Sequence, residues 1–175
     1  GGFEFVDKIV GGVIPKGFMP AIEKGIRDIM RQGIVAGYPI EDVRVEVFDG
    51  KTHSVDSKEI AFKTAGKLAF KDAFLKARPA LLEPVVNIEV TTPGDYVGSI
   101  AGDLSSRRGK VLGTEVMSSG AAVVKASVPL ADMMEYEPAL KSMTKGRGSF
   151  TMELSHYDPV PQRIAQDLVA QHDSE

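Results

Sequence analysis

Residues 85–104 read VVNIEVTTPGDYVGSIAGDL and contain the change of pattern that decides the fold class. The run 85–91 is rich in β-branched residues, which predicts a strand. Pro93-Gly94 then opens a helical stretch in which apolar side chains recur every four residues, at Tyr96, Ile100 and Leu104. A strand followed at once by an amphipathic helix indicates a unit in which helices pack on a sheet.

Two further strands, a second helix and a last strand follow in the same half of the chain. Residues 110–117 and 121–128 predict strands, and Ser118-Ser119-Gly120 between them predicts a hairpin turn. A helix is expected over 129–142 and a last strand over 150–154. The resulting order, β-α-β-β-α-β, is that of the ferredoxin-like unit.

The first half of the chain has its own alternation of strands and helices. A strand is expected over 3–10 and ends at Gly11-Gly12. Pro20 suits the first turn of a helix, and that helix is expected to end near Gly33. The alternating valines of 42–49 predict a half-buried strand.

A second helix of this half follows a short polar loop. Asp56 and Glu59 have the spacing of a capping box with Asp56 as the N-cap. The helix is expected to end by Arg78-Pro79, and 81–84 predict a linker. We expect one face of the helix to be lined by Ala61, Ala65, Leu68, Ala69 and Ala73.

A final amphipathic helix is indicated by Val160, Ile164, Leu168 and Val169. The whole pattern predicts an α+β protein of two small α/β-sandwich domains, the second ferredoxin-like (βαββαβ), plus this C-terminal helix.

The composition narrows the function classes. The 175 residues contain 43% hydrophobic and 26% charged residues, which is typical of a globular protein. Without cysteine the chain has no disulfide, no thiolate nucleophile and no Cys-based metal site. Because the net charge is −3, any nucleic-acid-binding surface would have to be a local basic patch.

No apolar run has the length of a membrane span, and the first residues lack the pattern of a signal peptide. The abrupt start in a strand, without Met, suggests a piece of a longer protein.

The motifs of nucleotide and metal chemistry are absent from the sequence. There is no P-loop and no Gly-x-Gly-x-x-Gly between a strand and a helix. The three histidines, His53, His156 and His172, have no second His at helical spacing. His53, Ser54 and Asp56 are too close along one loop to form a triad in the required order, because triads are assembled across a fold.

Five stretches resemble elongation factor G, and together they cover nearly the whole chain. They are FEFVDKIVGGVIPK at 3–16, THSVDSKEIAFK at 52–63, LEP at 82–84 with VTTP at 90–93, GDLSSRRG at 102–109, and SMTKGRGSF at 142–150. Residues 134–138, Met-Glu-Tyr-Glu-Pro, depart from the common family form, which has Phe-Gly-Tyr followed by small residues. This departure suggests a divergent paralogue.

The resemblance implies a division of the chain. Residues 1–82 would be most of domain IV, with its first strands missing, and 83–156 would be the ferredoxin-like domain V. Residues 157–175 would form a C-terminal helix and tail that packs on domain IV. The GTPase domain, with its GTP and Mg²⁺, would lie outside this chain, so the chain itself would hold no cofactor and would not be an enzyme, whereas the parent protein would be a GTPase.

The resemblance also implies two sets of site residues. A domain IV tip would contact tRNA and mRNA in the decoding region through Lys51, Thr52, His53, Ser54 and Asp56. The His at the matching place in the eukaryotic counterpart carries the diphthamide modification. Domain V would contact large-subunit rRNA through Arg107, Arg108, Lys110, Lys145 and Arg147. The alternative for the tip residues is ordinary turn or helix-start chemistry. For Arg107, Arg108 and Lys110, here called the first basic cluster, the alternative is interaction with a helix dipole.

The resemblance implies a function in translocation. The expected partners are the ribosome (rRNA, A-site and P-site tRNA, mRNA and stalk-base proteins) and the remaining domains of the same polypeptide, with no membrane and a cytoplasmic location. Two alternatives stay open: a paralogue acting in ribosome recycling, or a general RNA-binding ferredoxin-like protein. Against the second, the predicted strands 110–117 and 121–128 lack the aromatic residues of an RNA-recognition sheet.

Overall fold

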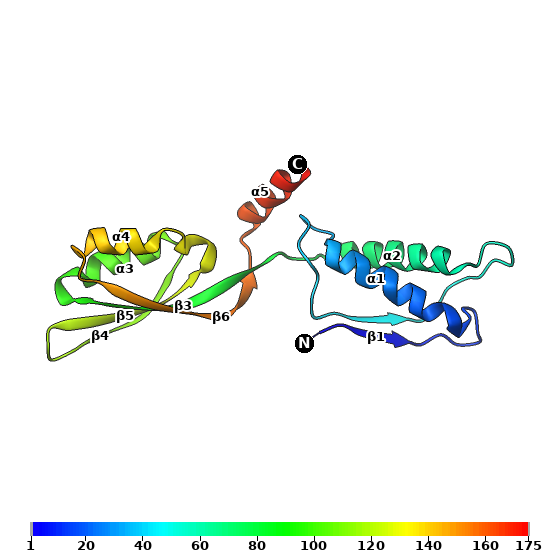
Figure 1. The fold of residues 1–175 in the computed structure, drawn as a ribbon, viewed down its shortest axis with the longest axis horizontal. Helices are drawn as coiled ribbons and strands as arrows, with labels where there is room; N and C mark the ends of the chain where they lie inside the picture. Colours follow the sequence, from blue (N-terminus) through cyan, green and yellow to red (C-terminus); the bar gives the residue numbers. More distant parts are fainter. Residues whose placement is uncertain (1, 175) are drawn as a thin grey trace. The chain divides into compact units, whose positions relative to one another are not determined.

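The chain is divided into two compact units in the computed structural model, which describes residues 2–174 (Figure 1). The first unit combines the chain up to Leu81 with the segment from Pro161 onward. The second unit is Leu82–Val160. The polypeptide therefore crosses from one unit to the other twice.

The first unit has two parallel strands and two helices. β1 (Glu4–Asp7) pairs with β2 (Arg44–Val47), with Phe5 opposite Val45. A short 3₁₀ turn, η1 (Lys16–Phe18), leads into α1 (Met19–Gln32), and α2 (Glu59–Lys76) follows β2. Both helices lie over the strands, and the buried core contains Ile14, Met19, Ala21, Ile22, Ile26, Ile29, Met30, Phe62 and Phe70.

Helix α1 has the predicted limits. Pro20 stands in its first turn, where no N–H is needed. Gly33 caps its C-terminus with φ 77°, a left-handed backbone that glycine adopts without strain. The predicted apolar positions Ile22, Ile26, Ile29 and Met30 are all buried.

Helix α2 differs from the prediction in its start, and its buried residues are not among those predicted to line one face. It begins at Glu59, and Lys58 occupies the N-cap position without a side-chain hydrogen bond, so the capping box at Asp56 was wrong. Its buried residues are Phe62, Gly66 and Phe70, because the large rings fill the core and a Gly at the crossing lets α1 approach.

The five residues predicted to line one face of α2 are all exposed. Ala65, Ala69 and Ala73 line an open apolar groove of about 410 Å³ together with residues of α1 and β2.

The second unit is a four-stranded antiparallel sheet with two helices. Its elements are β3 (Leu82–Pro93), η2 (Gly94–Tyr96), α3 (Val97–Ser106), β4 (Lys110–Val116), β5 (Ala121–Pro129), η3 (Leu130–Met133), α4 (Tyr136–Met143) and β6 (Ser149–Pro159). The strand order β4-β5-β3-β6 and the βαββαβ sequence confirm the ferredoxin-like fold.

The core of the second unit lies between the helices and one face of the sheet. Ile100 and Leu104 of α3 and Tyr136 and Leu140 of α4 pack on the inward residues of β3 and β5. The helix predicted over 129–142 is broken at Met134 and Glu135, where the backbone is extended and then left-handed (φ 57°). Pro138 explains the break, because in a continuous helix it would have to donate an N–H that proline lacks. In the separate helix α4 it lies in the first turn, where no N–H is needed.

The linker predicted over 81–84 is also wrong for its last three residues. Leu82, Glu83 and Pro84 belong to β3 and pair with β6, opposite Pro159, Asp158 and Tyr157. Pro84 is tolerated because the pairing of β3 with β5 begins only at Val85. Strand β6 likewise runs five residues beyond the predicted 150–154, to Pro159.

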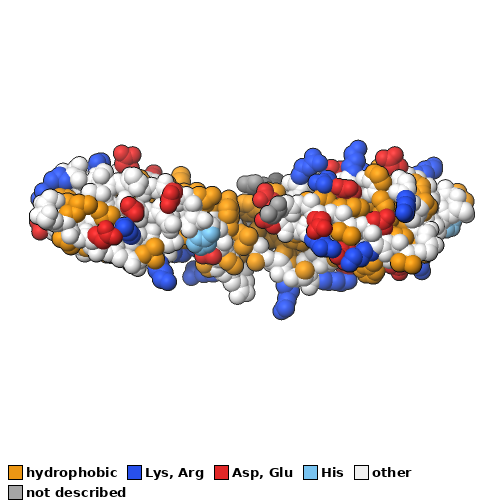
Figure 2. Space-filling model, turned by 90° about the horizontal axis from the view of Figure 1, so that it is seen from below, with side chains coloured by type: hydrophobic (Ala, Val, Ile, Leu, Met, Phe, Trp, Pro, Cys, Tyr) orange, Lys and Arg blue, Asp and Glu red, His pale blue; other side chains and the backbone are white. Residues whose placement is uncertain are grey.

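The C-terminal helix α5 (Gln162–Asp173) carries the predicted apolar residues Ile164, Leu168 and Val169, all half-buried. The ring of His172 lies against Gly37 of the first unit, so closely that a Cβ at Gly37 would come within 2.9 Å of it. Among the described residues, no helix has the length and apolar character needed to cross a membrane. Figure 2 shows one face of the molecule, on which each unit carries charged side chains of both signs.

Candidate nucleic-acid interface

The loop between β2 and α2 is held in a closed turn. The backbone N–H of His53 donates to Ser57 Oγ at 2.8 Å, and the Ser57 N–H donates to the His53 carbonyl at 3.1 Å. The Lys58 N–H donates to the Asp56 carbonyl at 2.9 Å. Three hydrogen bonds over residues 53–58 fix the backbone that carries the His53 ring.

The side chains of this loop point to solvent. The predicted tip residues Lys51, Thr52, His53, Ser54 and Asp56 are all exposed and lie in one loop. His53 Nδ1 is 3.5 Å from Asp56 Oδ2, and the two side chains are 72% and 81% exposed. The Asp56 carboxylate thus lies near Nδ1 of His53, and Nε2 remains free to donate a hydrogen bond to an external acceptor.

A second loop packs against the first. The segment between β1 and η1 is mostly exposed, with Val10 at 82%, yet its Ile14 is only 5% exposed. The Ile14 side chain lies directly against Gly50, where an added Cβ would collide with it. Sequence reasoning missed this contact, since the two residues are far apart in the chain and neither carries a signal by itself.

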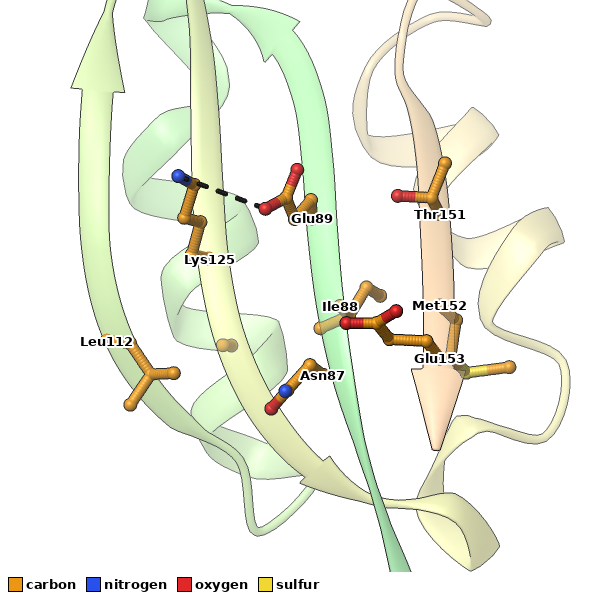
Figure 3. A pocket seen from close by; sticks show the side chains of 9 residues that line it. Asn87, Ile88, Glu89, Leu112, Lys125, Thr151, Met152 and Glu153 are labelled. Carbon is orange, nitrogen blue, oxygen red and sulfur yellow. Dashed lines mark ion pairs between the residues drawn. The ribbon is translucent and has the colours of Figure 1, made fainter. Parts of the chain in front are cut away.

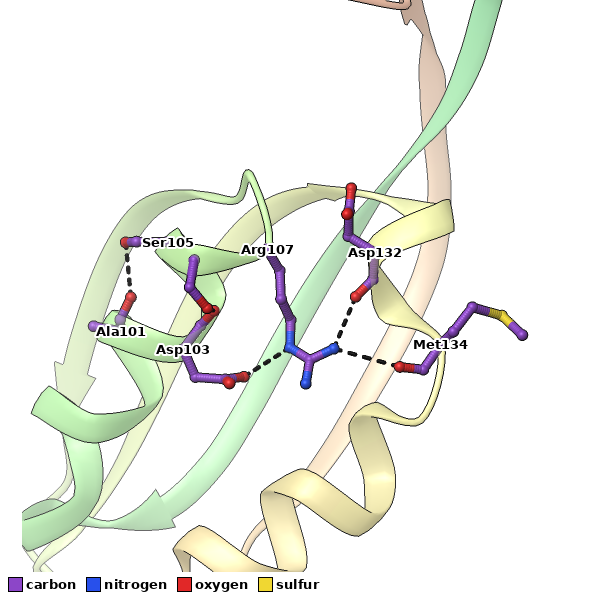
Figure 4. A network of polar contacts seen from close by, with 7 residues as sticks. Ala101, Asp103, Ser105, Arg107, Asp132 and Met134 are labelled. Atoms are coloured by element: carbon purple, nitrogen blue, oxygen red, sulfur yellow. Dashed lines mark hydrogen bonds and ion pairs between the residues drawn. The ribbon is translucent and has the colours of Figure 1, made fainter. Parts of the chain in front are cut away.

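Arg107 of the first predicted basic cluster is engaged inside the second unit (Figure 4). Its Nε donates to Asp103 Oδ2 at 2.8 Å and its Nη1 donates to the carbonyls of Asp132, at 2.8 Å, and Met134, at 3.4 Å. The guanidinium also lies 5.1 Å from the centre of the Tyr136 ring. Arg107 thus joins the end of α3 to the break between η3 and α4.

Arg108 is equally engaged. It forms a bidentate pair with Glu83, at 2.7 and 2.9 Å, and its Nη2 lies 2.6 Å from Asp132 Oδ2. The hydrogen bond to Glu83 raises the pKa of Arg108 above its usual range; partial burial opposes this effect, and the contact with Asp132 adds to it. Both arginines therefore have structural partners, and the exposed Lys110 beside them is the more available cation.

The second basic cluster, Lys141, Lys145 and Arg147, lies at the end of α4 and in the hydrogen-bonded loop that joins α4 to β6. The buried Thr144 hydroxyl donates to the Leu140 carbonyl and accepts the Gly148 N–H, both at 2.8 Å. Lys141 Nζ donates to the Gly148 carbonyl at 2.7 Å. Lys145 is exposed with φ 53°, and Arg147 lies 5.1 Å from the centre of the Tyr96 ring and donates to its hydroxyl.

The open face of the second unit's sheet has a different chemistry (Figure 3). A shallow hollow of about 460 Å³ is lined by Asn87, Ile88, Glu89, Leu112, Lys125, Ala126, Thr151, Met152 and Glu153. Lys125 pairs with Glu115 at 2.8 Å and Glu89 at 3.9 Å. Since no lining residue is aromatic and the carboxylates outnumber the single cation, this face is no base-stacking platform of the RNA-recognition type.

A chain of polar contacts on β6 was not predicted. Ser155 Oγ lies 2.9 Å from His156 Nδ1, and His156 Nε2 lies 2.9 Å from Asp158 Oδ2. The three residues are exposed and line none of the hollows described above, so they lack the water-excluded pocket that nucleophilic catalysis requires. Within residues 2–174, no three His, Asp or Glu side chains are grouped as metal ligands.

Comparison with known proteins agrees with this architecture. The family model "Elongation factor G, domain IV" matches residues 1–78, and "Elongation factor G C-terminus" matches residues 80–168. The elongation factor G of Aquifex pyrophilus is 57% identical over 170 residues, which are 97% of this chain and 24% of that protein. A crystal structure of a protein from Thermus thermophilus superposes with a TM-score of 0.82 at 41% identity, over 99% of this chain and 26% of the other.

The fold and the matches define the C-terminal domains of a translation elongation factor. The chain belongs to the elongation factor G family. It spans about a quarter of the length of the relatives it matches.

Proposed function

We propose that this chain acts as the ribosome-binding C-terminal part of a translational GTPase that promotes movement of tRNA and mRNA. The loop that carries His53 would reach the decoding region, and the second unit would contact large-subunit rRNA. The sequence contains no P-loop, so the proposal assigns GTP and Mg²⁺ to a part of the factor outside these residues.

The observation that carries the proposal is the braced and exposed His53 loop. The hydrogen bonds with Ser57 and the support of Gly50 by Ile14 order the backbone before any partner binds. A group that is already ordered loses less conformational entropy on binding than a flexible one. The exposed ring can then donate to phosphate or ribose oxygens of RNA.

The second unit contributes cations on ordered loops. Lys110 and Lys145 are exposed, and Arg147 is stacked on Tyr96, which holds its guanidinium near the surface. Such groups favour contacts with phosphates, which add affinity without reading sequence. Arg107 and Arg108 stay in the proposal chiefly as residues that hold this surface together, because their guanidinium groups already have partners.

The deciding experiment replaces His53 in an elongation factor G that contains this sequence. We expect His53→Ala to slow single-turnover tRNA–mRNA movement on the order of tenfold, which corresponds to about 1.4 kcal/mol, while ribosome-stimulated phosphate release stays unchanged. His156→Ala, an exposed histidine of the second unit, is the matched control and should change neither rate.

Three other outcomes would contradict the proposal. Equal loss of both rates would place His53 in activation or folding. Unchanged rates would remove the main support for the tip. If His53→Ala impaired only the splitting of ribosomes into subunits, the recycling alternative would replace translocation.

A further inference from the structure

We propose a second RNA-contacting surface on the outer face of α1 and α2, formed by Lys24, Arg31, Lys63, Lys67 and Lys71 and here called the helical basic face. Its partner would be the sugar–phosphate backbone of an RNA strand. The inference deepens the function proposed above and rests on it for the presence of RNA.

The two helices concentrate positive charge in a chain that is acidic overall. Together they contain seven Lys and Arg against four Asp and Glu, whereas the whole chain has a net charge of −3. A local excess of this kind is the footprint expected of a phosphate-binding surface on a protein without a basic net charge.

The two helices cross closely at Gly25 and Gly66, and this close crossing brings their cations near one another. A Cβ at Gly25 of α1 would collide with the Lys63 carbonyl of α2, and a Cβ at Gly66 would lie 2.9 Å from the Ile22 carbonyl. Lys63 Nζ therefore reaches Asp28 Oδ2 at 2.7 Å, and Lys67 Nζ reaches Gln32 Oε1 at 3.0 Å. Lys63 and Lys67 of α2 thus lie along the row of α1 that carries Asp28 and Gln32.

Asp28 is the carboxylate that this group of cations surrounds. Its pKa is lowered first by the hydrogen bond from Lys63, against some desolvation, and then by the charges of Lys63, Arg31 and Lys24. Lys24, Arg31 and Lys71 are exposed, and none of the three forms an ion pair within the part of the chain that the structure describes. These three cations are therefore available to an external anion.

The spacing of the face favours a polymer with regularly repeated charge. Lys63, Lys67 and Lys71 stand at i, i+4 and i+8, which places them about 6 Å apart along one side of α2. Lysine ammonium groups act as point charges, so such a row suits phosphates and carries no base readout. Because α2 starts directly after the His53 loop, an RNA strand at that loop could continue along the row for about 20 Å.

The test uses the 175-residue chain and a fluorescently labelled RNA hairpin, with binding followed by anisotropy between about 50 and 200 mM salt. The variant Lys24→Gln/Arg31→Gln/Lys71→Gln removes the three unpaired cations and leaves the Lys63–Asp28 pair intact. The control Lys16→Gln/Arg78→Gln/Arg163→Gln removes the same charge from exposed positions outside the two helices. Circular dichroism melting verifies that both variants are folded.

We expect the helical variant to bind the hairpin at least about tenfold more weakly than the control variant does. Its slope of log affinity against log salt should be shallower by about 2 to 3, since each lost phosphate contact removes roughly 0.7 to 0.9 of slope. Equal losses in the two variants would overturn the proposal. Binding of poly-glutamate as tight as that of RNA at equal salt would also overturn it, in favour of an acidic protein partner. These readouts do not involve His53, so the proposed function and this inference can fail separately.

Discussion

At the scale of single residues, the break before α4 places a side chain on a strained backbone. Glu135 adopts φ 57°, a left-handed conformation that costs a residue with a Cβ about 1 kcal/mol or more. The Phe-Gly-Tyr form that the resemblance implies would place Gly, which adopts this backbone without strain, at the position of Glu135. In this chain Arg107 donates to the carbonyls of Asp132 and Met134, which helps to hold Glu135 in its conformation.

Replacing Glu135 by Gly should stabilise the second unit. The relief of backbone strain exceeds the extra entropy of the unfolded chain, so we expect a net gain of up to about 1 kcal/mol, measured by denaturant unfolding. Glu137→Gly, in the first turn of α4 with ordinary helical backbone, should destabilise by up to about 1 kcal/mol. A loss of stability at both positions would contradict the strain argument.

The burial of Tyr136 makes the stability of the folded protein depend on pH in the alkaline range. Its side chain is 1% exposed and its hydroxyl has no hydrogen-bond partner among the described residues. Burial, assisted by the charge of Asp103 and opposed by that of Arg107, raises the pKa of Tyr136 from 10.0 to about 12. The folded state thus favours the neutral phenol, so this contribution to stability is complete below pH 10 and is lost as the pH rises from 10 toward 12.

Tyr136→Phe should therefore change stability by less than about 1 kcal/mol at neutral pH, because no hydrogen bond is lost. Above pH 10 the variant should become more stable than the parent by a growing margin. Thermal melting of both proteins from neutral to strongly alkaline pH gives the comparison. Parallel melting curves over the whole range would show that Tyr136 titrates normally.

At the scale of elements, the crossing of α1 and α2 depends on Gly25. A methyl group there would meet the backbone carbonyl of Lys63, which cannot rotate away. We expect Gly25→Ala to destabilise the first unit by about 2 to 3 kcal/mol through overpacking. Gly102→Ala in α3 has no atom within 4 Å of the new Cβ and should instead stabilise by roughly 0.5 to 1 kcal/mol. Differential scanning calorimetry of the two variants tests both signs.

The loop before α2 is ordered by a hydrogen bond from the His53 N–H to Ser57 Oγ, which a substitution can test. Ser57→Ala removes the acceptor of the His53 N–H and leaves the helix itself intact. We expect faster amide hydrogen exchange at His53, with the amides of α2 from Phe62 onward unchanged. Exchange at His53 as slow as in the parent would mean that Ser57 does not order the loop.

Some elements follow directly from local sequence signals, and others depend on contacts that the local sequence does not reveal. Periodicity and turn residues predicted the limits of α1, the hairpin between β4 and β5, and the ferredoxin-like order. The capping box at Asp56 failed because the polar residues there close a turn of their own before Glu59. The residues predicted to line one face of α2 are not its buried residues, because two phenylalanines and a glycine, rather than the alanines, match the surface of α1. Ion pairs such as Arg108–Glu83 join residues 25 positions apart and leave no local pattern.

At the scale of the whole molecule, the chain passes between the two units at Leu81/Leu82 and again at Val160/Pro161. The first of these junctions follows Arg78, which has φ 56°, and the exposed Ala80. We expect limited proteolysis with a protease of broad specificity to cut first between Ala77 and Leu81, since these residues lie outside regular structure. Mass spectrometry identifies the first cut. Initial cleavage inside β3 or α2 would disprove this boundary.

The pairing of β3 with β6 has a consequence for the way the chain is threaded. Leu82 and Pro159 are partners in one antiparallel ladder, so the second unit begins and ends at the same place. Closing a long flexible loop costs entropy that grows with the logarithm of its length. Once β3 and β6 have paired, the two ends of residues 82–160 lie close together, so for the first unit this segment acts as a short connection. The chain from Pro161 onward then starts close to Leu81. This topology favours a folding order in which the second unit folds first. Its folding brings together the two chain segments that form the first unit.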